Sequence, residues 1–350
     1  MFKEEFFREL KSKITNVPGD VMEDILADFE EHFKAGSADG LTEQEICQKL
    51  GQPGSIAEEI MEEFKKTKVE ESQEQQGQSV EKIRGGYEIS KEYVFNGVTE
   101  VEVDMHSSAI HFVRESRQDV RVEIEGKSRY DKFVLEVKDG KLRVFSKEPI
   151  VKFELFSFRG SLTTTIRLPM NYSGKIKAKS SAGKIRAEEL TSNIHFTTHA
   201  GSIAVSKHQS KKAYLDSSAG SVNAEFLGEV ALKAHSGAGS IKIKAEKTTE
   251  LDIDTGAGSI QAEVEKLTGT ASCSSGAGSV KLTAYEVMGD IKLSSGAGSI
   301  RAFLPENADI RIQLKKSGMG SVKSEVPGND SSPYTLKAST GVGSVRIKKL

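Results

Sequence analysis

Cysteines and long apolar runs are scarce in this chain of 350 residues. Only Cys47 and Cys273 are present, too few and too far apart for a disulfide framework. There is neither an N-terminal apolar stretch typical of a signal peptide nor an apolar run long enough for a transmembrane helix. These absences predict a soluble protein of a reducing compartment. We therefore expect a cytoplasmic protein that associates with a membrane only through a partner.

Net charge is also small, at −2, but the two parts of the chain differ strongly in sign. Residues 1–82 carry 20 Asp and Glu against 10 Lys and Arg, whereas the remainder carries 31 against 39. Such an asymmetry indicates that the two parts attract each other or serve separate partners.

The chain is rich in one four-residue corner, which recurs nine times. It reads AGKI at 182–185, then AGSI or AGSV, and finally MGSV at 319–322 and VGSV at 342–345. Its glycines stand 18 to 23 residues apart, a period that indicates stacked repeats of one supersecondary unit. The corner glycines are Gly183, Gly201, Gly220, Gly239, Gly258, Gly278, Gly298, Gly320 and Gly343.

Residues aligned on the corner glycine alternate in character. A β-branched residue follows two positions later and a mostly small or aliphatic one four positions later, with a polar residue between them in all copies but one. This alternation indicates a half-buried strand, and a second strand precedes each corner. The sequence therefore predicts a mainly β fold, a parallel β-solenoid (β-helix-like) with coils of about 19 residues and two strands per coil.

Two further columns predict how the coils stack. A Ser or Thr stands three residues before each corner glycine, which suits a buried ladder of hydroxyl groups bonded to one another. The glycine itself is expected to allow a tight turn with positive φ.

Residues 1–67 instead show helical periodicity, with N-cap pairs such as Thr42 and Glu45. They predict a small N-terminal all-α domain of four helices. We expect these at 2–15, 21–35 (ended by Gly36), after Thr42 as far as Gly51, and 56–67.

Three further segments complete the predicted domain organisation. Residues 68–86 are expected to be a flexible linker, 87–170 irregular β coils or a cap, and 171–350 the regular β-solenoid. Ser108-Ala109-Ile110 is interpreted as a degenerate corner, and 151–158 as a covering segment. Early strands are expected at 98–104, 109–114, 119–125, 132–138, 141–146 and 161–168.

Two resemblances support this division. The N-terminal region resembles the helical signalling domain found beside PadR-type regulators in Firmicutes. The segments that carry this resemblance are ILADFEEHFKAG at 25–36, GLTEQEICQKLGQP at 40–53 and SIAEEI at 55–60. Residues 87–350 resemble the bacterial β-strand-repeat family labelled "putative adhesin". The resemblance is carried by the GAGSI and GAGSV corners and by the Leu-Pro segments at 168–169 and 304–305. The second resemblance implies the fold, and because some relatives belong to cell-envelope stress systems, it also implies an interaction role.

Patterns for catalysis and metal binding are weak. His195 and His199 are four residues apart on one strand, roughly 13 Å and too far for one metal ion. Asp252 and Asp254 point outward beside basic residues of the preceding repeat, so a cross-coil ion pair explains them better than an acid–base pair. We therefore predict no metal, no cofactor and no enzyme, and leave a polysaccharide-active β-helix enzyme as an alternative.

One outward column is strongly basic. The third residue after the corner glycine is a cation in six of nine copies and an acid in none. Stacked like charges repel, so an anionic partner would relieve them, although lysine on strands also serves to keep sheets soluble. Nucleic acid is not expected, because aromatic stacking residues are missing from this column. The basic column consists of Arg186, Lys242, Lys281, Arg301, Lys323 and Arg346.

These observations favour a non-enzymatic cytoplasmic interaction or scaffold protein, in cell-envelope stress or transcriptional signalling. Its partner is expected to be a protein, either a regulator or a membrane-associated stress protein, with an anionic surface as the second partner class. A surface adhesin-like binding rod is the alternative.

Overall fold

The computed structural model describes residues 1–15, 17, 19–38, 40–61, 79–81, 87–106, 108–128, 132–147, 162–316 and 318–350. The chain is mainly β with a small N-terminal helical region, as the sequence predicts. It forms two compact units: Met1–Glu88 with Lys127–Val134 and Ser146–Gly160, and Ile89–Gly126 with Leu135–Phe145 and Ser161–Leu350. Within the described ranges, no helix has the length and apolar character needed to cross a membrane.

The helical region contains α1 (Lys3–Lys13), α2 (Gly19–Ala38), α3 (Glu43–Leu50) and a further helical segment at 53–61. The capping box of α3 is confirmed. The Thr42 N–H donates to Glu45 Oε2 at 2.8 Å, and the Glu45 N–H donates back to Thr42 Oγ1 at 3.4 Å. These bonds satisfy backbone donors at the start of α3.

Two predicted helix boundaries are wrong, each for a packing or capping reason. Helix α2 continues past Gly36, where an added Cβ would lie 2.7 Å from Ile46 Cγ1. Gly36 therefore permits close packing against α3 rather than ending α2. The last helical segment starts at Pro53 instead of near 56, because proline suits the first helical turn. Its first bond joins the Ile56 N–H to the Gln52 carbonyl at 3.2 Å.

Apolar side chains from all four helical segments form one core. Phe6 lies at its centre, with ring centroids 5.5 Å from Phe29 and 5.8 Å from Phe33. The apolar faces predicted for the helices supply most of this core. Two of their predicted members, the Val21 side chain and Phe64, lie outside the described residues. The covering segment predicted at 151–158 of the β region lies outside them as well. The buried members are Phe6, Leu10, Ile14, Ile25, Phe29, Phe33, Ile46, Cys47, Leu50, Ile56, Ala57 and Ile60.

The remaining elements are strands. Within 68–86 the structure describes only β1 (Ser79–Glu81). The six early strands that the sequence predicts are present as β3 to β8. The early strands are β2 (Tyr87–Phe95), β3 (Glu100–Met105), β4 (Ser108–Glu115), β5 (Val120–Ser128), β6 (Lys132–Lys138), β7 (Lys141–Lys147) and β8 (Leu162–Pro169).

The strands of the repeat region follow, and their residues alternate between buried and exposed. They are β9 (Lys175–Ser180), β10 (Ile185–Glu188), β11 (Ile194–Thr198), β12 (Ile203–His208), β13 (Lys212–Ser217), β14 (Val222–Ser236), β15 (Ile241–Thr255), β16 (Ile260–Ser275), β17 (Val280–Val287), β18 (Ile291–Ala297), β19 (Ile300–Leu304), β20 (Arg311–Lys316), β21 (Val322–Ser324), β22 (Thr335–Val342) and β23 (Val345–Lys349).

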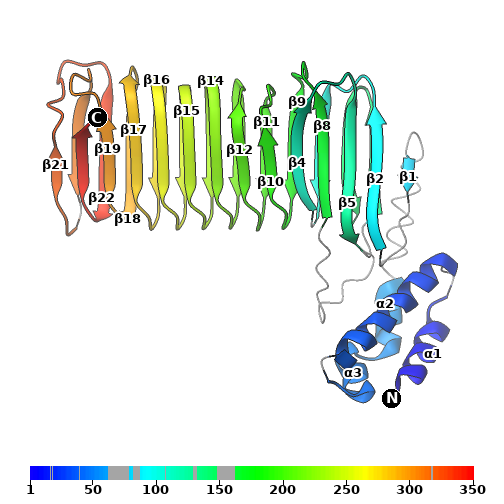
Figure 1. Ribbon diagram of the computed structural model, residues 1–350. Coiled ribbons are helices and arrows are strands. Elements are labelled where there is room, and N and C mark those ends of the chain that lie inside the picture. Colours follow the sequence, from blue (N-terminus) through cyan, green and yellow to red (C-terminus); the bar gives the residue numbers. More distant parts are fainter. Residues whose placement is uncertain are drawn as a thin grey trace. The chain divides into compact units, whose positions relative to one another are not determined.

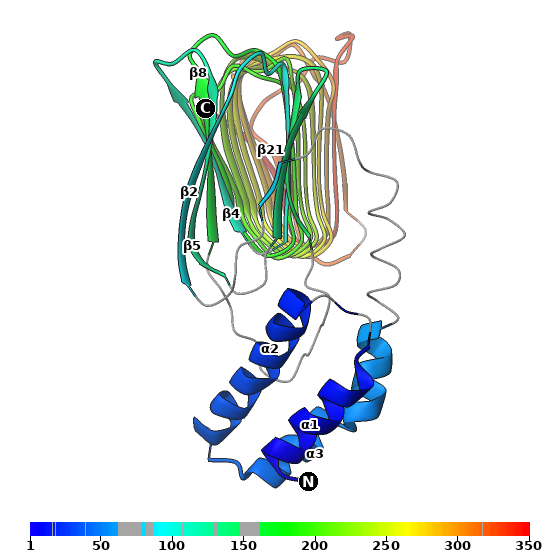
Figure 2. The ribbon, with the colours of Figure 1, turned by 90° about the vertical axis from the view of Figure 1, so that its right-hand side faces the viewer.

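Successive repeats pair in parallel, residue for residue. Ile185 pairs with Ile203, Ile203 with Val222, and Val222 with Ile241. Inward aliphatic residues therefore stack in columns along a solenoid-like sheet. Figure 1 shows the repeats side by side, and in Figure 2, which looks along the stack, their outlines superimpose.

The early strands continue the same stack. Ile110 of β4 pairs with Ile185 of β10, which is the position expected for the degenerate corner at 108–110. Strand β3 pairs in parallel with β9, whereas β5 pairs antiparallel with β8. The antiparallel pair marks the end of the regular stacking.

Glycine is required at the corners because neighbouring coils approach closely there. A positive φ is the reason at few of them. A Cβ on Gly239 would overlap the carbonyl oxygen of Gly220, and the same overlap recurs from Gly183 to Gly343. Only Gly320 and Gly343 among the corner glycines have a positive φ, of 139°. The prediction of a positive-φ turn at every corner is therefore wrong.

Where the structure describes it, the Ser/Thr column is buried as predicted, but its hydrogen bonds differ from a hydroxyl-to-hydroxyl ladder. Thr255 Oγ1 donates to the Gly239 carbonyl at 2.9 Å and accepts from the Gly258 N–H at 3.2 Å. Ser217 bonds to Gly201 and Gly220 in the same way. Each such hydroxyl thus joins the backbones of two consecutive coils, because the glycine carbonyl lies nearer than the next hydroxyl.

The last two coils do not stack in chain order. Ile300 pairs with Val345, and Val345 pairs in turn with Val322. The coil of β22 and β23 therefore lies between β18–β19 and the terminal coil of β20–β21 (Figure 1). Its inward residues are aliphatic and fully buried, as at Leu336 and Ile347, whereas the terminal coil has Ser324 at the position paired with Ile347. The more polar coil takes the end of the stack because fewer of its side chains gain from burial.

Candidate docking surface

All six residues of the basic column point outward from the strands that follow the corners. In β15, Ile241 and Ile243 are buried, whereas Lys242 between them is exposed. The same alternation exposes Arg186, Lys281, Arg301 and Arg346, because successive side chains of a strand face opposite sides. Lys323 is also exposed, but on β21, where all three residues are exposed. The cations come from β10, β15, β17, β19, β21 and β23.

Pairing register brings four of the six cations next to one another. Lys281 pairs with Arg301, Arg301 with Arg346, and Arg346 with Lys323. We call these residues the four-cation run. At roughly 4.8 Å between strands, the run extends about 14 Å. Lys242 is separated from the run by Gln261, and Arg186 stands alone near the other end, because Ala204 and Asn223 follow it.

The four-cation run has no carboxylate partner among the described residues, where no Asp or Glu oxygen lies within 4.0 Å of its nitrogens. Lys281 Nζ instead lies 5.1 Å from the ring centroid of Phe303, a cation–π contact. By contrast, lysines elsewhere in the repeats do form ion pairs, as Lys266 does with Glu286 at 2.7 Å. The run is therefore an exposed cationic surface open to an anionic group.

Serines line the bend beside the basic column. Each corner serine precedes its column residue by two positions, and serines of neighbouring coils are bonded to one another. The Ser279 N–H donates to Ser259 Oγ at 3.3 Å, and Ser321 Oγ lies 3.2 Å from Ser344 Oγ. This edge thus combines hydroxyl donors with cations, the groups that bind phosphate and carboxylate oxygens.

His111 continues the outward column beyond Arg186, with which it pairs in register, but it adds no positive charge near neutral pH. Burial lowers the pKa of His111, and the positive charges of Arg186 and Lys184 lower it further. Sequence reasoning missed this residue because the degenerate corner before it has no glycine.

Some outward residues of the strands that precede the corners are paired with residues of neighbouring coils. Asp254 Oδ2 lies 3.2 Å from His235 Nδ1, so the predicted cross-coil contact is present, and it is an ion pair when the imidazole is protonated. Lys233 pairs with Glu250 at 3.0 Å rather than with Asp252. Within the described part of the chain, no three His, Cys, Asp or Glu side chains are grouped to hold a metal ion.

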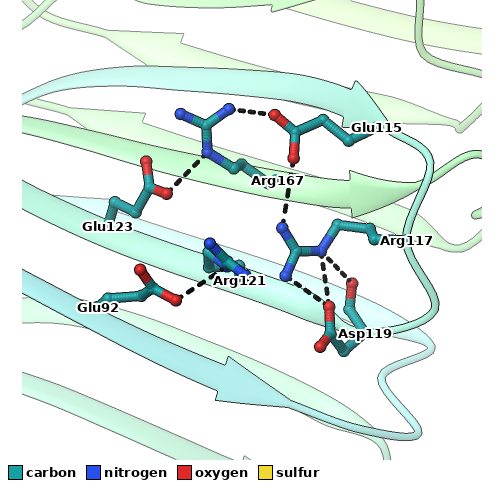
Figure 3. Close-up of polar contacts among 7 residues, drawn as sticks. All are labelled: Glu92, Glu115, Arg117, Asp119, Arg121, Glu123 and Arg167. Atoms are coloured by element: carbon teal, nitrogen blue, oxygen red, sulfur yellow. Dashed lines mark hydrogen bonds and ion pairs between the residues drawn. The ribbon is translucent and has the colours of Figure 1, made fainter.

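A second polar cluster is formed by side chains of β2, β4, β5, β8 and the turn between β4 and β5 (Figure 3). These strands lie at the opposite end of the stack from β20–β21 (Figure 1). Arg117 lies 3.3 Å from Glu115 and 2.6 Å from Asp119, and Arg167 lies 2.8 Å from Glu123 and also contacts Glu115. Arg121 pairs with Glu92 at 3.1 Å. These cations already have partners, so the cluster resembles a polar end cap more than a free binding surface.

The repeat architecture and the outward column define a β-repeat protein with an exposed basic column. Residues 98–349 match the family model of the Toastrack DUF4097 domain, and the chain belongs to that family. Residues 5–59 match the HAAS family model, which is consistent with a helical, regulator-associated domain. Both resemblances seen in the sequence are thereby confirmed.

Several solved structures of bacterial proteins are similar to the chain over about three quarters of its length. A "putative adhesin" from Parabacteroides merdae is 13% identical, with 77% of this chain and 98% of that chain covered and a TM-score of 0.45. A "putative adhesin" from Bacteroides fragilis is 13% identical, with 76% and 100% covered and a TM-score of 0.33. A "putative lipid binding protein" from Parabacteroides distasonis is 14% identical, with 77% and 100% covered and a TM-score of 0.29. No curated protein matches the chain.

Proposed function

We propose that this protein is a non-enzymatic binding or scaffold protein whose repeat region docks an anionic partner along the basic column. The observation that carries the proposal is the four-cation run, exposed on adjacent coils with no described carboxylate within 4.0 Å. Stacked cations repel one another, and an acidic partner surface would remove that repulsion.

The rest of the chain suits a scaffold. Parallel registers support the interpretation of residues 171–350 as a β-solenoid with two strands per coil of about 19 residues. Residues 1–67 supply a separate helical surface for a regulator protein. We assign the protein to the cytoplasm, in envelope-stress or transcriptional signalling. Fractionation of native cells tests this assignment, and recovery at the cell surface would favour the adhesin-like alternative.

The non-enzymatic part of the proposal rests on the carboxylates. Asp254, which a polysaccharide-cleaving enzyme could use, pairs with His235, and Asp252 pairs in register with Lys233. Incubation of the full chain with candidate polysaccharides, followed by analysis of released sugars, tests it. Any cleavage that Asp252→Asn or Asp254→Asn abolishes would overturn it.

Docking itself is tested with a defined acidic probe, fluorescently labelled polyglutamate, at low salt. The full chain should bind this probe, and binding should weaken with added salt, because exposed charges are screened over about 8–10 Å at physiological ionic strength. Arg301→Gln, Arg346→Gln and Lys323→Gln combined should weaken binding by about tenfold or more.

The matched control carries Lys177→Gln, Lys292→Gln and Lys337→Gln. These lysines are exposed on the strands that precede the corners, and the control has the same change in net charge. If both triple variants bind the probe equally, attraction depends on net charge alone, and the basic column is not a docking surface.

A further inference from the structure

The residue before the corner glycine changes character in the last two coils of the stack. It is alanine in the first seven corners, and it becomes Val342 and Met319 in the last two. The Val342 side chain is 54% exposed and that of Met319 is 83% exposed. The two residues lie on neighbouring coils, since the Gly343 N–H donates to the Met319 carbonyl at 3.1 Å.

These two apolar side chains share their corner with cations. Arg346 follows Val342 by four residues, and Lys323 follows Met319 by four residues. Between them the bend contains Ser344 and Ser321, whose hydroxyl oxygens are 3.2 Å apart. The corner thus has exposed apolar groups on one side of the bend, hydroxyl groups in the bend, and cations on the other side. We call these six residues the C-terminal corner.

We propose that the C-terminal corner binds the surface of a lipid bilayer that contains anionic lipids. Met319 and Val342 insert among the lipid chains just below the headgroups, while Arg346 and Lys323 contact lipid phosphates and the serine hydroxyls donate to them. This inference rests on the proposed function, because it assigns an anionic lipid surface as the partner of one end of the basic column.

The shape and charge of the corner favour a bilayer over other partners. Met319 is a flexible apolar side chain that is largely exposed, and a fluid interface accommodates such a side chain without a matching pocket. A second copy of the same corner would bring Lys323 and Arg346 against their own counterparts, which repel. An acidic protein would satisfy the cations but leave Met319 in water.

The test is sedimentation of the full chain with vesicles of phosphatidylcholine, with and without phosphatidylglycerol. The parent should bind only the vesicles that contain phosphatidylglycerol. Arg301→Gln, Arg346→Gln and Lys323→Gln combined should weaken this binding by about 100-fold. Met319→Ser with Val342→Ala should weaken it by about tenfold at unchanged charge. The matched control is Met288→Ser, which removes a methionine that is 43% exposed elsewhere on the β unit and should bind as the parent does.

A fluorescent label reports insertion directly. An environment-sensitive dye on Met319→Cys should shift to shorter wavelength with phosphatidylglycerol vesicles, and the same dye on Met288→Cys should not. Labelling is selective because the native Cys47 and Cys273 are both buried.

The possible outcomes separate this inference from the proposed function. If the parent does not bind the anionic vesicles, or if Met319→Ser with Val342→Ala binds as the parent does and the dye does not shift, the lipid inference is wrong. If in that case polyglutamate binding still depends on Arg301, Arg346 and Lys323, the proposed function stands and the partner is an acidic protein. If neither probe depends on these cations, both fail.

Discussion

Replacing Thr198 by valine removes one hydroxyl of the Ser/Thr column with little change of shape. Thr198 is fully buried; its Oγ1 donates to the Gly183 carbonyl at 3.2 Å and accepts from the Gly201 N–H at 3.1 Å. The variant leaves one buried acceptor and one buried donor without this partner. Since each such loss costs about 1–3 kcal/mol, we expect the free energy of unfolding of the β unit to fall by about 2–4 kcal/mol.

The assay is urea unfolding followed by the β signal in far-ultraviolet circular dichroism. Thr197→Val is the matched control, because Thr197 is the neighbouring residue on β11 and faces outward; it should change stability by less than about 0.5 kcal/mol. Hydrogen exchange of the Gly201 amide should also become faster in Thr198→Val alone. Equal unfolding midpoints for the two variants would refute the account of how the coils are joined.

Two further predictions concern other buried positions. Gly239→Ala should destabilise the β unit by more than about 3 kcal/mol in the same urea assay, because its Cβ would overlap the Gly220 carbonyl, and an unchanged unfolding midpoint would refute close coil approach. Burial lowers the pKa of His208 to about 4, although its Nε2 lies 2.8 Å from the Ser192 carbonyl oxygen. An unfolded histidine has a pKa of about 6.5, so the unfolded chain binds the extra proton between these values. Stability should therefore be complete above pH ~6.5 and fall by about 3 kcal/mol towards pH ~4. His208→Leu should lose less stability over that range, and parallel pH profiles would contradict this assignment.

The sequence predicts the repeats well because each coil repeats the same local requirements. A single sequence shows these requirements directly, because it contains nine copies of the corner. They are a glycine at the corner, a β-branched residue two positions later and a hydroxyl-bearing residue three positions earlier. In the regular coils these columns correctly predict which residues are buried and that Arg186 and Lys242 face outward, whereas Val322 of the terminal coil is 39% exposed. Where a column is degenerate, as at Ser108-Ala109-Ile110, the neighbouring His111 is easily missed.

Two features could not be predicted because they depend on contacts between coils. The order of the last coils follows from the greater burial of Leu336 and Ile347, and corner spacing alone does not reveal it. The role of the Ser/Thr column depends on how closely the glycine carbonyl of the next coil approaches. The substitution of alanine by Met319 and Val342 is visible in the sequence, but the structure is needed to show how far these side chains are exposed.

The central claim is that the four-cation run is maintained for an anionic ligand and not for the fold. Unfolding of the triple variant Arg301→Gln, Arg346→Gln and Lys323→Gln in urea at low salt tests it without any ligand. Lys281 stays unchanged so that its contact with Phe303 is kept. Removing stacked like charges should leave the variant as stable as the parent or more stable by up to about 1 kcal/mol, and salt should reduce the difference. A variant clearly less stable than the parent at every salt concentration would show that these cations hold the fold together and would contradict the claim.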